Sequence, residues 1–130
     1  GGPGDEWIIT SFADLKVIDL VGKTSLVELV ALYRKCDAVI THDSGPMHLA
    51  GLAGAPLVAL FGPTNPYEKV PRNGLHEILW GGEDLACRPC YDGKGYDNCQ
   101  DNLCMKQISV VEVFNAINSV SIGGPSVNRN

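Results

Sequence analysis

The sequence predicts an α/β fold built on a parallel β-sheet. The chain has 130 residues, enough for one domain, and apolar residues make up 45% of it, as in a protein with a packed core. Four short apolar segments have the length of β-strands, and segments with helical spacing separate them. Strands that alternate with helices in this way are typical of a parallel sheet with helices on its faces.

In the N-terminal part, an apolar stripe at helical spacing favours a helix over residues 5–15. Residues 17–21 are a short apolar run and are predicted to form the first strand. Ser25 and Glu28 have the spacing of a capping box, in which each side chain satisfies a backbone amide of the other residue. A helix is therefore expected over residues 25–35.

The second strand is predicted over residues 38–41 and leads directly into a helix. Ser44 is a suitable N-cap, and Pro46 suits the first helical turn because its missing N–H would have no partner there. Gly54 is expected to end this helix, since glycine adopts the left-handed conformation that closes many helices.

The rest of the chain is predicted to hold two strands and a helix. Residues 57–61 are continuously apolar, as expected for a strand that is buried on both faces. Residues 76–80 form the fourth predicted strand, and residues 110–120 form the last helix. We expect one domain over residues 1–120, followed by a disordered tail over residues 121–130.

Charge and hydropathy narrow the classes of partner. The net charge of -5 argues against nucleic acid or an anionic membrane as the main partner. The most apolar stretch, residues 49–63, is interrupted by glycine and proline and is shorter than the about 20 apolar residues that span a bilayer. No signal peptide is visible. A local anion site stays open, because backbone N–H groups bind anions without basic side chains.

Three loops are expected to share one crevice, because ligands of parallel sheets bind at the carboxyl ends of the strands. These loops are residues 22–24, 42–45 and 62–65. The middle loop leads into a helix N-terminus, which carries partial positive charge. Four amides at this helix start are expected to point into the crevice, those of Ser44, Gly45, Met47 and His48. This arrangement predicts a diphosphate-binding site, and a capped helix without a ligand is the alternative.

Several side chains near this loop have more than one interpretation. Asp43 would repel a phosphate, so it is expected to accept hydrogen bonds from loop amides or from sugar hydroxyls. His48 is more often a structural residue than a catalyst, and Lys23 could pair with a phosphate or be solvated. The glycine-rich motifs of mononucleotide kinases and of nicotinamide-binding enzymes are absent from the sequence.

The chain has five cysteines, and four of them lie close together in the sequence: Cys87, Cys90, Cys99 and Cys104. They could hold zinc as thiolates, form two disulfides, or remain reduced. A structural role is favoured in all three cases, and no metal is assigned to the functional site. Cys36 stands alone on an apolar helical segment and is interpreted as a small buried residue.

Four ordered segments together resemble glycosyltransferase family 9, the ADP-heptose:lipopolysaccharide heptosyltransferases, and within it the type II enzymes. The segments are LVGKTSL at residues 20–26, CDAVITHDSGPMHLA at 36–50, PLVALFGPT at 56–64 and CRPC at 87–90. The resemblance covers residues 1 to about 118. Family members usually have Asn or Val where His42 stands.

The resemblance implies the GT-B architecture, in which two Rossmann-like halves face each other across a cleft. The chain resembles only the C-terminal, donor-binding half, and it lacks the strand-helix-strand with which that half begins in the family. Residues 17–21 would then have no neighbouring strand beside residues 38–41. We therefore expect a piece of a larger protein, or a gap that is filled by rearrangement or by self-association through unpaired strand edges.

The resemblance also implies a binding site for an ADP-heptose-like nucleotide sugar. The adenine and ribose pocket would be lined by Lys23, Thr24 and Ser25. The diphosphate or the sugar would be contacted by Asp43, Ser44 and Gly45, and His48 would lie beside the diphosphate. The family's inverting reaction uses an acidic base from the N-terminal half, so no catalytic residue is named in this chain. No cofactor is implied.

The implied function is donor binding in an inverting glycosyltransferase for lipopolysaccharide core or a related glycan. The chain alone would be inactive, because the lipid-linked glycan acceptor would bind through the missing half. Family members work in the bacterial cytoplasm, at the inner face of the inner membrane. Two alternatives are a nucleotide-sugar epimerase-like domain, whose similar fold also carries an Asp-Ser-Gly loop, and a zinc-stabilised, non-catalytic interaction module built on the cysteines.

Overall fold

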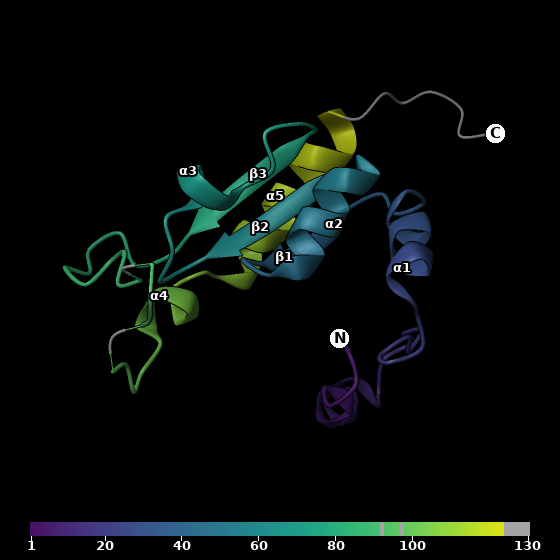
Figure 1. The fold of residues 1–130 in the computed structure, drawn as a ribbon, viewed down its shortest axis with the longest axis horizontal. Coiled ribbons are helices and arrows are strands. Elements are labelled where there is room, and N and C mark those ends of the chain that lie inside the picture. The colour runs from purple at the N-terminus through teal and green to yellow at the C-terminus, as the bar shows by residue number, and fades with distance from the viewer. Residues whose placement is uncertain (92, 97, 124–130) are drawn as a thin grey trace.

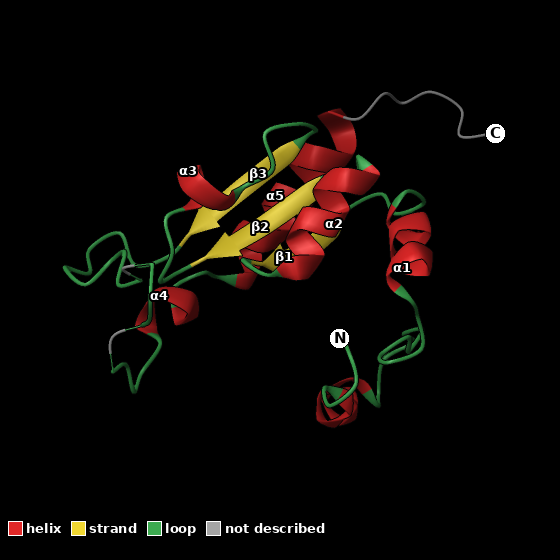
Figure 2. Ribbon diagram, in the orientation of Figure 1, coloured by secondary structure: helices red, strands yellow, loops and turns green. Residues whose placement is uncertain are grey.

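The computed structural model describes residues 1–91, 93–96 and 98–123. Its centre is a sheet of three parallel strands in the order β1-β2-β3. The strands are β1 (Val39–His42), β2 (Leu57–Phe61) and β3 (His76–Trp80). Helix α2 (Gly45–Ala53) covers one face of the sheet and helix α5 (Val110–Gly123) covers the other (Figures 1 and 2). The predicted α/β class with a parallel sheet is confirmed.

Strand β2 lies between two apolar layers. Leu57, Ala59 and Phe61 pack with the buried face of α2, whereas Val58 packs on the opposite face of the sheet with α5. Alternate side chains of a strand point to opposite faces, so a strand covered on both sides must be apolar at every position. This explains why the sequence of residues 57–61 shows no polar position.

The predicted capping box at Ser25 and the predicted helix end at Gly54 are confirmed, whereas the helix that starts after Ser25 ends at Tyr33 and not at residue 35. Helix α1 (Leu26–Tyr33) begins with the full capping box, in which the Ser25 hydroxyl accepts from the Glu28 amide and the Glu28 carboxylate accepts from the Ser25 amide at 2.7 Å. Gly54 ends α2 in the left-handed conformation, with φ of 68°. Helix α1 contacts α2, so it joins the domain through a helix and not through the sheet.

The predictions for the first 24 residues are wrong in two places. Residues 17–21 form no strand, and Ile18 is 88% exposed. The expected helix over residues 5–15 is a shorter 3-10 helix, η1 (Glu6–Phe12). A strand needs a hydrogen-bonded neighbour and a helix needs an apolar surface against which to pack, and among the described residues neither lies beside this segment. It lies apart from the sheet in Figure 1.

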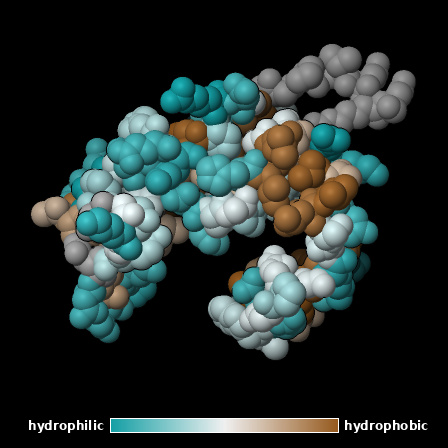
Figure 3. Space-filling view, in the orientation of Figure 1, coloured by the Kyte–Doolittle hydropathy of each residue, from teal (hydrophilic) through white to brown (hydrophobic). Residues whose placement is uncertain are grey.

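The outer edge of β1 has no partner strand within the residues that the structure describes. Ile40 on this strand is 48% exposed, and Figure 3 shows an apolar area on the neighbouring surface over α2. This edge matches the expectation of an unpaired strand edge beside residues 38–41. Self-association through it stays a prediction.

The C-terminal part contains two short helices, α3 (Pro66–Lys69) and α4 (Leu103–Lys106), before α5. Helix α5 continues to Gly123, so residues 121–123, which were predicted to belong to the tail, are helical. The remaining predicted tail, residues 124–130, lies outside the described residues. In the described part of the chain, no helix has both the length and the apolar character needed to cross a bilayer.

Replacing Gly81 with alanine is expected to destabilise the fold. A Cβ at Gly81 would lie 1.8 Å from the backbone oxygen of Cys104, which cannot swing aside as a side chain can. Overpacking of this kind costs about 1–3 kcal/mol, so a denaturant titration should show a loss on this scale in the free energy of unfolding. Gly2→Ala is the control, because its Cβ would meet no atom within 4 Å. Equal stability of the two variants would contradict this packing.

Candidate functional site

The loops that follow β1 and β2 meet at one pocket of about 250 Å³. His42 and Asp43 line it at the end of β1. The end of β2 and the loop after it contribute Leu60, Gly62, Pro63 and Thr64. The C-terminal part of the chain contributes Tyr96, Asn102 and Met105. The pocket therefore lies at the carboxyl ends of parallel strands, where the sequence predicts a ligand.

The start of α2 is not capped by a side chain. Ser44 is the N-cap residue, as predicted, but its hydroxyl donates to the His42 carbonyl oxygen at 3.1 Å and does not accept from an amide of the helix. A serine N-cap ordinarily accepts such a hydrogen bond. In the described part of the chain the amides of Ser44 and Gly45 make no hydrogen bond.

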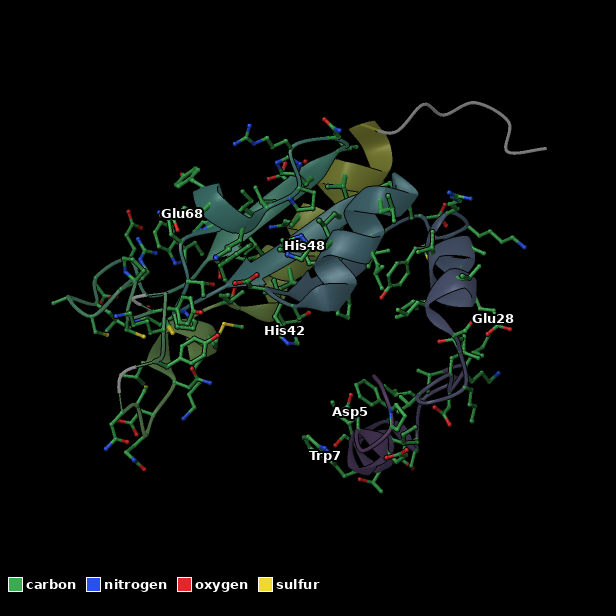
Figure 4. All side chains as sticks on the ribbon, viewed as in Figure 1. Asp5, Trp7, Glu28, His42, His48 and Glu68 are labelled. Atoms are coloured by element: carbon green, nitrogen blue, oxygen red, sulfur yellow. The ribbon has the colours of Figure 1, made fainter. Side chains whose placement is uncertain are left out.

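Open space lies beside Gly45. A Cβ at this residue would meet no atom within 4 Å, so the chain leaves room next to the start of the helix. The Met47 amide was predicted to point into the crevice, but it donates to the Ser44 carbonyl oxygen at 3.0 Å, which corrects that part of the prediction. His48 is exposed one turn into α2, and Figure 4 shows it on the helix above His42.

Asp43 is half-buried at the pocket, and its carboxylate makes no hydrogen bond within the described residues. The predicted hydrogen bonds from loop amides are therefore not formed there. A carboxylate at this position is available to hydroxyl donors of a ligand, and it opposes an anion that is placed directly against it.

Lys23, Thr24 and Ser25 are not brought to this pocket. The Lys23 ammonium donates to the Asp19 carboxylate at 2.5 Å, and this hydrogen bond is the main reason why the pKa of Asp19 lies below its ordinary value. Ser25 caps α1. Figure 4 shows the residues labelled on the N-terminal segment and at the start of α1, Asp5 and Glu28, well away from His42. Their role in an adenine and ribose pocket stays a prediction.

The pocket residues that sequence reasoning missed lie in the cysteine-containing segment. Tyr96, Asn102 and Met105 have no periodic pattern that would place them near β1. The segment reaches the site because the amides of Cys90 and Tyr91 donate to the Pro63 carbonyl oxygen at 3.0 and 3.1 Å. The cluster of cysteines marked this segment as unusual, but it gave no sign of where the segment would lie.

The cysteines themselves form no disulfide, and all five are described. Across the described ranges of the chain, no group of three or more His, Cys, Asp or Glu side chains is placed to hold a metal ion. Cys104 instead packs against the backbone at Gly62, where an added Cβ would lie 2.7 Å from its sulfur. Neither the zinc interpretation nor the disulfide interpretation has support in this structure.

A larger pocket of about 410 Å³ lies beyond β3. Its charged lining residues are all acidic: Glu83, Asp84 and Glu112. Two of these carboxylates have partners in the fold, since Asp84 accepts from the Gln107 amide at 3.1 Å and Glu112 accepts from the Ser109 hydroxyl at 2.6 Å. Three carboxylates repel an anionic ligand, so the pocket beside Asp43 is the better candidate despite its smaller volume.

Comparisons with known proteins show which family the chain resembles. The model of glycosyltransferase family 9 (heptosyltransferase) matches residues 6–99. A lipooligosaccharide heptosyltransferase 2 of Haemophilus influenzae is 50% identical over 62 residues, which are 48% of this chain and 18% of that protein. A lipooligosaccharide heptosyltransferase 2 of Campylobacter jejuni is 34% identical over 110 residues, which are 83% of this chain and 33% of that protein.

Solved structures give the same result. The ADP-heptose lipopolysaccharide heptosyltransferase II of Escherichia coli superposes on 94% of this chain with a TM-score of 0.69 and 27% identity. A family 9 glycosyltransferase of Veillonella parvula superposes with a TM-score of 0.70 and 27% identity. The chain spans 35% of each of these two proteins. The comparisons give no support to the epimerase alternative, and they show that this chain belongs to glycosyltransferase family 9.

Proposed function

We propose that this chain is the donor-binding part of a heptosyl-type glycosyltransferase for lipopolysaccharide core or a related glycan. The observation that carries the proposal is the start of α2, where two amides have no partner in the described chain, Gly45 has room beside it, and the preceding Asp43 lines a pocket. Three of the four relatives described above are named as heptosyltransferases, and one of these is named for ADP-heptose. A diphosphate is the part of such a donor that a helix N-terminus binds.

The helix start supplies both hydrogen-bond donors and electrostatic attraction. Aligned peptide dipoles place roughly half a positive charge at a helix N-terminus, and this favours an anion there. In glycosyl transfer the nucleoside diphosphate gains charge as the bond to the sugar breaks. Amides that are already fixed stabilise this charge without reorganising during the reaction. The contribution of this chain is therefore to position the donor and to stabilise its leaving group.

The rest of the reaction belongs to other parts of the protein. Inversion at the sugar needs a base that activates the acceptor hydroxyl from the opposite face, and we assign this base to the half of the enzyme that binds the acceptor. The acceptor would be a lipid-linked glycan. We therefore place the enzyme in the cytoplasm, where it works peripherally at the inner face of the inner membrane.

Gly45→Val is expected to weaken binding of ADP by more than about tenfold. A Cβ at Gly45 would meet no atom within 4 Å, so the valine side chain would take up room at the start of the helix that a bound diphosphate needs. Isothermal calorimetry with ADP measures the affinity, and thermal unfolding checks the fold. Gly2→Val is the matched control, since its Cβ also meets no atom within 4 Å. Unchanged ADP affinity in Gly45→Val would disprove the proposed diphosphate site.

Asp43→Asn is expected to change the affinity for ADP-heptose and the affinity for ADP in different ways. The substitution keeps the side chain's size and removes its charge, so hydrogen bonds from sugar hydroxyls weaken, and ADP-heptose should bind about tenfold less tightly. ADP alone should bind equally well or better, because the carboxylate no longer opposes the diphosphate. Asp14→Asn, in the exposed N-terminal segment, is the control. Equal weakening of ADP and ADP-heptose would contradict a contact with the sugar.

A further inference from the structure

We infer that Tyr96 is a sugar-stacking residue, whose ring forms the wall of the pocket against which the transferred sugar packs. This inference rests on the proposed function and names a binding residue that lies outside the motifs of the family resemblance. Tyr96 lines the same pocket as Asp43, and it comes from the cysteine-containing segment. Its side chain is 65% exposed, so most of the ring surface is available to a ligand.

The Tyr96 ring packs against the ring of Tyr91. Its centroid lies 4.8 Å from that of Tyr91, with the two ring planes tilted by 39°, and the two residues form an antiparallel β-bridge. Tyr91 is in turn fixed to the loop after β2, because its amide donates to the Pro63 carbonyl oxygen at 3.1 Å. The Lys69 ammonium lies 5.8 Å from the Tyr91 ring centroid, within the range of a cation–π contact.

The pocket combines two kinds of surface that together suit a sugar ring. The C–H groups on one face of a pyranose gain dispersion contacts from the flat face of an aromatic ring. The hydroxyl groups around its edge need acceptors, and the Asp43 carboxylate is one such acceptor in the same pocket. Adenine, the base of the donor for which one relative is named, would also stack on a tyrosine, but it offers a carboxylate only its one amino group.

The position and size of the pocket favour the transferred sugar over the base. Sites that enclose whole drug-sized ligands measure roughly 300–1,000 Å³. This pocket measures about 250 Å³, which suits one ring and not an entire nucleotide sugar. Asp43 directly precedes the two open amides of Ser44 and Gly45. A diphosphate at those amides places the sugar, which is bonded directly to it, next to Asp43, whereas the base is separated from it by the ribose.

The test compares Tyr96→Ala and Tyr96→Phe in the full chain, with ADP and ADP-heptose as calorimetric probes. Tyr96→Ala should weaken ADP-heptose binding by about five- to tenfold, because stacking of an aromatic ring contributes on this scale. ADP binding should not change, and this also verifies that the variant is folded. Tyr96→Phe should bind ADP-heptose like the wild type, because stacking needs the ring and not the hydroxyl.

Tyr67→Ala is the matched control. Tyr67 is 81% exposed and stacks edge-on against Trp80 at 6.2 Å between ring centroids, and it is not among the residues that line the pocket. The inference is overturned if Tyr96→Ala leaves ADP-heptose binding unchanged, if it weakens ADP to the same degree, or if Tyr96→Phe loses as much affinity as Tyr96→Ala. A wild-type chain that binds neither probe would instead overturn the proposed function.

Discussion

Parallel pairing of β1 with β2 places His42 beside Leu60, so the two strands end at the same edge of the sheet. The loops that follow them must then meet, and the pocket beside Asp43 is their meeting point. Two parallel strands start at the same end of the sheet, so the chain must return from the end of β1 to the start of β2. Helix α2 supplies this connection. The helix N-terminus consequently lies at the pocket. The relation between strand ends and helix start underlies every functional statement about this chain.

Helix α2 keeps its first residues in place because its other face is anchored. Met47 and Ala50 are fully buried against the sheet, and the left-handed Gly54 closes the helix before β2. A helix that is fixed by its buried side presents its first amides without further ordering when a ligand arrives. The cysteine-containing segment completes the site, since it is tied to Pro63 and packs Cys104 against Gly62.

Local signals in the sequence predicted the parts of the fold that local physics decides. The capping box at Ser25 and the continuously apolar strand β2 can each be predicted from a few neighbouring residues. Residues 17–21 also have the composition of a strand, but a strand exists only with a neighbour to pair with, and the part of the chain that the structure describes places none beside them. Tyr96 was missed for a related reason. Its place at the pocket depends on a distant carbonyl, that of Pro63, which no pattern near Tyr96 reveals.

The central claim is that the first amides of α2 hold the diphosphate of a nucleotide sugar. Nuclear magnetic resonance tests it most directly, by following the backbone amide signals of an isotope-labelled chain during titration with ADP. The amide signals of Ser44 and Gly45 should shift with a common saturating curve, and that of Met47, which already donates to Ser44, should shift less. Saturable ADP binding that leaves the Ser44 and Gly45 amides unshifted would contradict the account.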